Sequence, residues 1–146
     1  DRSRGLGDVY KRQPGNKFEP GKKPMSTMAP VIVFDENKDL MLITGSPGGS
    51  LIPAAILRVI TGVIDFDLNI GEATMLTRVH KDWPTTGILH EKTLSSDLAK
   101  GLNIIGHKVT EEHTMGSTQS IHIVDGINYG YADLRRPNAS VSIQPN

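Results

Sequence analysis

The most regular hydrophobic pattern in the chain lies between residues 52 and 63, where apolar side chains recur every three or four positions. This spacing predicts a helix with one broad apolar face, and Pro53 stands in its first turn, where a missing N–H has no cost. The hydroxyls and the acid of residues 95–97 are typical of a helix start, so a second helix is expected from there to Gly106. A short helix is expected at residues 70–75. The buried stripe of the second helix is expected to consist of Leu98, Leu102 and Ile105.

Apolar and β-branched runs predict five strands, at residues 31–34, 40–44, 88–92, 120–124 and 128–132. The first two are expected to pair as a hairpin across a polar turn, and the last two as a hairpin across Asp125–Gly126. Because neither of the first two runs alternates apolar with polar residues, both faces of their sheet are expected to be covered. Strands outnumber regular βα units, which favours a layered α+β fold over a parallel doubly wound sheet.

The composition narrows the class of protein. The chain has 146 residues, which suits one domain, and its 16 Lys and Arg residues balance its 16 Asp and Glu residues. Zero net charge argues against a nucleic-acid binder, because phosphate contacts need a basic surface. No apolar run approaches the 18 or so residues of a membrane span. The absence of cysteine excludes disulfides, thiolate nucleophiles and Cys-ligated metals.

The two ends differ from the rest of the chain. Residues 1–13 have no Met start, no apolar stretch of a signal peptide and no periodic pattern, and they resemble the read-through translation of a sequencing adaptor. We expect a non-native leader there, with a disordered basic linker as the alternative. The domain itself is expected to span residues 14–137. The residues from Arg135 onward are expected to form a polar tail, with 138–146 outside the domain.

The sharpest local feature is the glycine loop at residues 45–50, which joins a predicted strand to a predicted helix. Gly48 and Gly49 would let backbone N–H groups face a ligand, and the helix start adds its positive dipole. This arrangement suits a phosphate, a carboxylate or a developing oxyanion. The loop lacks the lysine of a phosphate-binding P-loop and the spacing of a dinucleotide fingerprint, so no cofactor is expected. The alternative is a tight structural turn.

A second feature is the hydroxyl pair Ser26 and Thr27, which lies between two prolines. Such a pair can donate hydrogen bonds to a carboxylate with little loss of entropy; the alternative, which the spacing alone favours, is a solvated loop. The five histidines show no metal-ligand spacing, so no metal site is expected. There is also no Gly-x-Ser-x-Gly elbow. From their chemistry alone, the residues offer neither a nucleophile nor a general base.

Two segments have a specific sequence: residues 44–50 are TGSPGGS and residues 21–30 are GKKPMSTMAP. The first is identical to a loop of the gamma-glutamyltranspeptidases, also called glutathione hydrolases, and the second resembles their segment GKRPLSSMSP. Together the matches run in order from about residue 15 to 137. Further blocks that resemble the same family lie at residues 67–73, 78–83, 115–121 and 129–135.

The resemblance implies part of a four-layer αββα N-terminal-nucleophile hydrolase fold, with two stacked sheets between helical layers. In that family a precursor cleaves itself into a large and a small subunit, and the new N-terminal threonine of the small subunit is the nucleophile. The family's T-T-H nucleophile segment and its acidic M-D-D-F region have no counterpart in this sequence. The chain is therefore expected to be the C-terminal part of the small subunit, incomplete as a fold and inactive by itself.

The same resemblance assigns roles to four residues. Ser26 and Thr27 would bind the α-carboxylate of the glutamyl group. Gly48 and Gly49 would supply the N–H groups that face the tetrahedral oxyanion. Thr27 stands where the family usually has a second serine, so it keeps a hydroxyl donor and adds a methyl group.

The reaction that the resemblance implies is cleavage of the γ-glutamyl amide of glutathione, followed by transfer to water, an amino acid or a dipeptide. The implied partners are γ-glutamyl compounds, their acceptors and the large subunit of the same precursor; no nucleic acid is expected. Two alternatives stay open: an acylase of the same fold that acts on glutaryl-cephalosporins, and a non-catalytic relative that binds an amino acid or peptide. A periplasmic or secreted location is expected from the family.

Overall fold

The computed structural model describes residues 19–23, 26–82, 87–137 and 139–143. The predicted leader at residues 1–13 lies outside these described residues. In chain order the elements are β1 (Val31–Phe34), β2 (Leu40–Gly45), the short 3-10 helix η2 (Gly49–Leu51), α2 (Ile52–Ile64), α3 (Ile70–Met75), β3 (Val79–His80), β4 (Gly87–Glu91), α4 (Ser96–Ile104), β5 (Lys108–Glu112), β6 (Gln119–Val124) and β7 (Ile127–Ala132).

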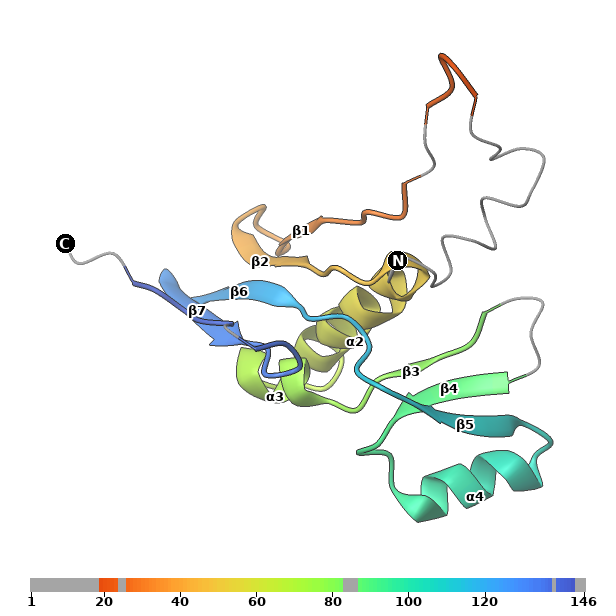
Figure 1. The fold of residues 1–146 in the computed structure, drawn as a ribbon. Helices are drawn as coiled ribbons and strands as arrows, with labels where there is room; N and C mark the ends of the chain where they lie inside the picture. Colours follow the sequence, from red (N-terminus) through yellow and green to blue (C-terminus); the bar gives the residue numbers. More distant parts are fainter. Residues whose placement is uncertain (1–18, 24–25, 83–86, 138, 144–146) are drawn as a thin grey trace.

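The strands form two sheets (Figure 1). The larger sheet has the order β1-β2-β6-β7, and all of its neighbours are antiparallel, so the two predicted hairpins pair with each other through β2 and β6. The smaller sheet has the order β3-β4-β5; β4 and β5 are parallel and are connected by α4. This mixture of helices and mainly antiparallel strands confirms the predicted α+β class.

One face of the larger sheet packs against α2 and α3. The apolar face predicted for α2 supplies Val59 and Val63 to the core, where they meet Leu42 of β2 and Ile70 and Ala73 of α3. α3 has the predicted bounds, since Asn69 and Glu72 form a capping box at its start. The two helices therefore fix where β2 ends, which is where the glycine loop begins.

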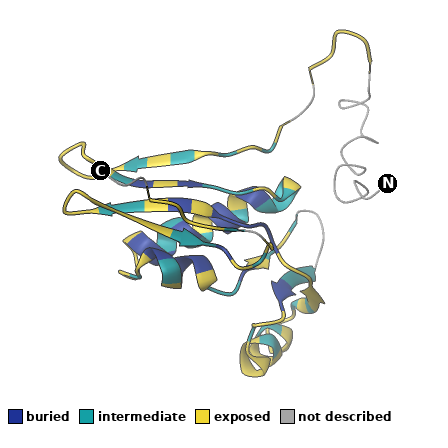
Figure 2. Cartoon of the chain, turned by 60° about the vertical axis from the view of Figure 1, so that its left-hand side comes forward, coloured by how far each residue is buried: buried dark blue, intermediate teal, exposed yellow. Residues whose placement is uncertain are grey.

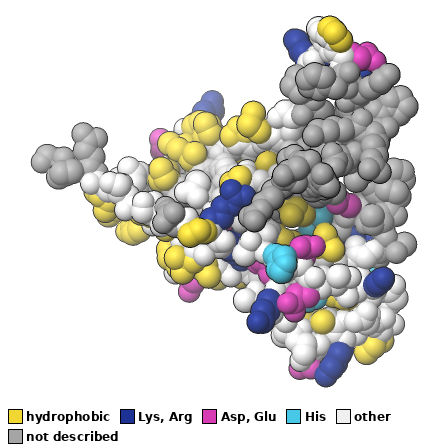
Figure 3. All heavy atoms as spheres, in the orientation of Figure 1, with side chains coloured by type: hydrophobic (Ala, Val, Ile, Leu, Met, Phe, Trp, Pro, Cys, Tyr) yellow, Lys and Arg dark blue, Asp and Glu magenta, His cyan; other side chains and the backbone are white. Residues whose placement is uncertain are grey.

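The opposite face of the larger sheet is apolar but exposed, so the expectation that both faces are covered is wrong for the described residues. Ile32 and Phe34 of β1 are each 59% exposed, and their neighbours Ile43 and Ile121 are also exposed. Side chains alternate in direction along a strand, so an unbroken apolar run supplies apolar groups to both faces. Within the described residues, α2 and α3 pack on the other face of this sheet (Figure 2), and Figure 3 shows hydrophobic side chains at the surface near β1 and β2.

α4 confirms the predicted start and stop but not the predicted buried stripe. Ser95 caps the helix through a hydrogen bond from the Leu98 N–H (3.3 Å), and Gly106 follows its end with a φ of +93°. Leu98 and Ile105 are nevertheless 61% and 70% exposed, and no residue of α4 is buried. The helix packs against β5 at the edge of a three-stranded sheet, which is too narrow to cover its apolar side.

None of the helices in the described part of the chain combines the length and the apolar character that a membrane crossing requires.

Candidate functional site

The glycine loop has the strand–turn–helix geometry that its sequence predicts. β2 ends at Gly45 and η2 begins at Gly49, directly before α2. Gly48 has φ +144° and ψ 13°, a region closed to residues with a side chain, and Gly49 has φ +60°. The Leu51 N–H donates to the Gly48 carbonyl (3.2 Å) and closes the turn. Backbone N–H groups at the head of a helix can bind an anion or a developing oxyanion.

The loop rests on a distant segment of the chain. The Ser46 hydroxyl donates to the Pro47 carbonyl (2.8 Å) and accepts the N–H of Ser117 (3.0 Å). The Gly48 position faces the Gly116 backbone, because a Cβ built at Gly48 would lie 3.4 Å from the Gly116 Cα. The loop and the segment before β6 are therefore in van der Waals contact.

The hydroxyl pair leaves the sheet at the same end as the glycine loop. β1 and β2 are antiparallel and Val31 pairs with Thr44, so residues before Val31 and residues after Gly45 continue in one direction (Figure 1). Ser26 is exposed, and its Oγ accepts the Met28 N–H (3.2 Å). The geometry is compatible with the roles expected for the two loops, and those roles stay predictions.

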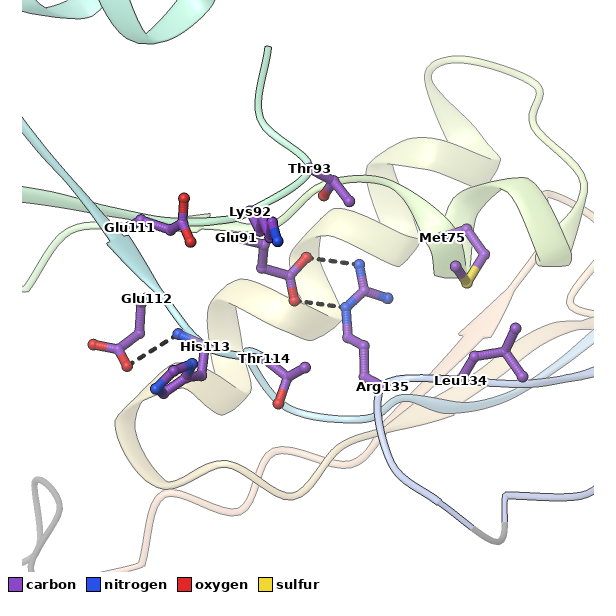
Figure 4. Close-up of a pocket in the computed structure, with 10 residues that line it drawn as sticks. All are labelled: Met75, Glu91, Lys92, Thr93, Glu111, Glu112, His113, Thr114, Leu134 and Arg135. Atoms are coloured by element: carbon purple, nitrogen blue, oxygen red, sulfur yellow. Dashed lines mark hydrogen bonds and ion pairs between the residues drawn. The ribbon is translucent and has the colours of Figure 1, made fainter. Parts of the chain in front are cut away.

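Four charged side chains that the sequence analysis gave no role form a buried network, named the charged network below. Arg78 binds Asp133 (2.7 Å), and Arg135 binds both oxygens of Glu91 (2.6 and 2.7 Å) and one oxygen of Asp133 (3.2 Å). All four side chains are at most 8% exposed. Figure 4 shows the two parallel contacts between Glu91 and Arg135. Bidentate pairs of this kind are the stronger charge-assisted hydrogen bonds.

The charged network joins elements that are far apart in the sequence. Arg135, which was expected to begin a polar tail, instead donates to the carbonyls of Thr74 (2.7 Å) and Leu76 (2.9 Å) at the end of α3. Arg78 donates to the Met115 carbonyl (2.6 Å). The expectation for Arg135 is wrong because its guanidinium has five donors, and the fold places acceptors around it.

The pKa values of both carboxylates of the network are lowered from their usual values. Burial by itself raises the pKa of Glu91, but hydrogen bonds from Arg135 and from the N–H groups of Met115 and Arg78 hold that pKa below its usual value. The pKa of Asp133 is also lowered: burial acts against this, and the Arg135 N–H and the Arg78 guanidinium overcome it. The network is therefore a set of stable ion pairs and not a proton-transfer group.

Two open clefts lie elsewhere on the surface. One of about 410 Å³ borders the charged network and is lined by Met75, Leu134 and charged residues of β4 and β5 (Figure 4). The other, of about 710 Å³, lies between the α2–α3 connection and the β6–β7 hairpin. Neither is lined by Ser26, Thr27, Gly48 or Gly49. Within the described residues, no group of three or more His, Asp or Glu side chains could hold a metal ion.

Sequence reasoning missed the charged network, although one signal was present. Arg78 and Arg135 both lie in blocks that carry the family resemblance, and Asp133 follows directly after an apolar strand. Charged residues next to apolar elements are candidates for buried ion pairs. The partner of each charge could not be read from the sequence.

Comparison with known proteins gives consistent matches. The family model described as Gamma-glutamyltranspeptidase matches residues 3–143. The chain is 42% identical over 134 residues to the glutathione hydrolase proenzyme of Escherichia coli (strain K12), covering 90% of this chain and 23% of that protein. The family match includes most of residues 1–13, whose origin stays a prediction.

Solved structures agree over most of the chain. A T380A mutant of Helicobacter pylori gamma-glutamyltranspeptidase has a TM-score of 0.76 and 35% identity, covering 82% of this chain and 66% of that chain. The W525D mutant of the Pseudomonas nitroreducens enzyme has a TM-score of 0.80 and 29% identity, covering 91% and 70%. The chain spans less than a quarter of the length of the curated proenzymes that it matches.

Proposed function

The chain belongs to the gamma-glutamyltranspeptidase family, and on this premise we propose that it is part of an enzyme that cleaves the γ-glutamyl amide of glutathione. The glutamyl group passes to water, an amino acid or a dipeptide. The observation that carries the proposal is the Gly48–Gly49 turn, which has left-handed backbone angles at the head of α2. These angles and the helix start support the proposal, because amide cleavage needs N–H donors for a developing oxyanion.

In the proposed reaction the nucleophile is a threonine from a segment of the protein outside this chain. Its hydroxyl oxygen attacks the γ-carbonyl carbon, and its proton passes to the α-amino group of the same threonine. The carbonyl oxygen becomes an oxyanion that accepts hydrogen bonds from the Gly48 and Gly49 N–H groups. The C–N bond then breaks, the departing amine takes up the proton, and water or an acceptor amine releases the glutamyl group from the acyl-enzyme.

Ser26 and Thr27 bind the α-carboxylate of the glutamyl group in this scheme. The support is their position at the end of the sheet where the glycine loop lies. The scheme further implies a precursor that divides into a large and a small subunit, with this chain in the small one. A periplasmic or secreted location follows from the family alone, and fractionation of cells that express the full-length protein tests it.

The test is an assay of the full-length protein with γ-glutamyl-p-nitroanilide and, in parallel, with glutaryl-p-nitroanilide, which lacks the α-amino group. We expect turnover of the first substrate, and a fall of at least about 10²–10³ in kcat for Gly48→Pro, because proline has no N–H donor and cannot adopt the φ of +144° at this position. Gly101→Ala, at an open position of α4, is the control and keeps normal turnover. Preference for the glutaryl substrate would favour the acylase instead, and normal turnover by Gly48→Pro would contradict the oxyanion role.

A further inference from the structure

The Ser46 hydroxyl stands at the junction between the glycine loop and the segment before β6. It donates to the Pro47 carbonyl (2.8 Å) and accepts the Ser117 N–H (3.0 Å), so a single side chain joins positions 71 residues apart. Both of its hydrogen bonds are with backbone groups. The hydroxyl therefore restrains the path of the loop.

The peptide that Ser46 restrains is the one that carries the proposed oxyanion donor. The Pro47 carbonyl and the Gly48 N–H belong to the same planar peptide unit, and in a trans peptide they point in opposite directions. A hydrogen bond that fixes the carbonyl consequently fixes the direction of the N–H. Gly48 has a φ of +144° and, as a glycine, can adopt many other backbone angles. The restraint therefore acts on a peptide that could otherwise rotate.

Gly116 makes the contact possible because it has no side chain. A Cβ at this position would lie 2.6 Å from the Ser46 Oγ and 3.0 Å from the Pro47 carbonyl oxygen. Its φ of +71° also disfavours other residues. Any larger residue at position 116 would displace the hydroxyl, the carbonyl or both.

The segment beneath the turn is itself fixed at both ends by the charged network. At its start the Met115 carbonyl accepts from Arg78 (2.6 Å), and the Met115 N–H donates to Glu91 (3.0 Å). At its end the Thr118 N–H donates to Asp133 (2.7 Å). The surface on which the loop rests is thus held by buried charges, and a loop held against it is preorganised.

From these contacts we propose that Ser46 and Gly116 are positioning residues that aim the Gly48 N–H at the oxyanion. The proposal rests on the proposed function. It concerns the direction of one donor, so it affects the transition state more than the bound substrate. Loss of the Ser46 hydroxyl therefore lowers kcat and leaves KM nearly unchanged.

The experiment compares Ser46→Ala with Ser46→Thr in the full-length protein, at equal concentrations of correctly cleaved enzyme, with γ-glutamyl-p-nitroanilide as substrate. We expect kcat to fall about tenfold in Ser46→Ala, the size of effect that one lost hydrogen bond can produce, with KM within about twofold. Ser46→Thr keeps the hydroxyl and restores kcat to within about threefold. Ser96→Ala, an exposed serine of α4, is the matched control and keeps the normal kcat.

A second readout separates positioning from general damage to the fold. A boronic acid analogue of glutamate forms a tetrahedral anion at the nucleophile, so its inhibition constant reports the oxyanion donors directly. In Ser46→Ala and in Gly116→Ala this constant rises by about the same factor as kcat falls. If Gly116→Ala does not fold, the two Ser46 variants decide alone.

The outcomes distinguish the two proposals. If Gly48→Pro lowers kcat by at least about 10²–10³ while Ser46→Ala retains normal kcat and normal boronate inhibition, the positioning role is refuted and the proposed function stands. If KM rises with kcat unchanged, Ser46 serves substrate binding and the positioning role is also refuted. Absence of γ-glutamyl turnover in the unsubstituted full-length protein would refute the proposed function itself.

Discussion

The charged network and the glycine loop are held in opposite ways. In the network the contacts are made by side chains: four buried charges bind one another at 2.6–3.2 Å and also bind the backbone around them. In the glycine loop the shape is set by backbone angles and not by side-chain contacts of the loop tip, where Pro47 and Gly49 are exposed. The network is stable because its groups are satisfied, whereas the proposed role of the loop requires N–H donors that are free to meet a substrate.

This difference separates the charged network, which stabilises the fold, from the glycine loop, which is proposed to act in the reaction. Two glycines with positive φ leave the loop few bonds of its own, so its shape also depends on what lies beneath it. Here that support is the segment before β6, whose ends bind the charged network. Damage to the network should therefore appear first as lost stability, and damage to the loop first as lost activity.

The largest effect is expected from Arg78→Met in the full-length protein. The variant leaves Asp133 buried with one arginine fewer, and removing one partner of a buried pair costs about 3–5 kcal/mol of unfolding free energy. The fall is measured by chemical denaturation. Arg136→Met, at an exposed neighbour of the network, should change stability by no more than about 0.5 kcal/mol. A loss below about 1 kcal/mol for Arg78→Met would show that the pair is not a source of stability.

For Gly49→Ala in the glycine loop we expect the opposite of the result for Arg78→Met, namely lost activity with little change in stability. A methyl group here meets open space, so the whole effect comes from the φ of +60°. Left-handed backbone costs alanine about 1–2 kcal/mol, which corresponds to a fall of about 5–30-fold in the population of the correct turn. We expect kcat to fall by that factor with little change in melting temperature. Gly49→Asn, which tolerates this conformation, should lose less, and equal losses in both variants would contradict the argument.

The elements that the sequence predicts best are those determined by residues close together in the chain. α3 has its predicted bounds because Asn69 and Glu72, its capping-box pair, lie within the helix start itself. β5 was missed because its residues are largely polar and its pairing partner is the parallel strand β4, beyond a whole helix. The exposed stripe of α4 was predicted to be buried because periodicity identifies an apolar face but not what covers it.

The candidate site divides in the same way. Gly48 and Gly49 could be identified because consecutive glycines between a strand and a helix signal their conformation within a few residues. The charged network could not, since Arg78 and Asp133 are 55 positions apart and nothing local pairs them. The proposed role of Ser46 and Gly116 depends on a contact between segments that are distant in the sequence, so only the structure could reveal it.

Lowering the pH should reduce the stability that the charged network contributes to the fold. The pKa values of Glu91 and Asp133 are lower in the fold than in the unfolded chain, because the arginines and backbone N–H groups around them outweigh burial. Their contribution to stability is therefore complete above the unfolded values of about 4 and is lost as the pH falls through the lower folded values. Denaturation of Glu91→Gln at neutral pH and at about pH 3 should show a smaller loss on acidification than the unsubstituted protein. An equal loss in both would mean that acid sensitivity arises outside the network.

The smallest effect is expected at a buried hydrogen bond between β2 and β6, the strands that lie next to the two regions. The hydroxyl oxygens of Thr44 and Ser120 lie 2.8 Å apart in the core. Thr44 stands directly before the glycine loop, and Ser120 lies in β6. Thr44→Val or Ser120→Ala leaves the other hydroxyl buried without this partner and should cost about 1 kcal/mol. The double variant should cost little more than either single one, because it removes both polar groups, which corresponds to a coupling of about 0.5–1.5 kcal/mol in denaturation measurements. Strictly additive losses would mean that the two hydroxyls do not stabilise each other.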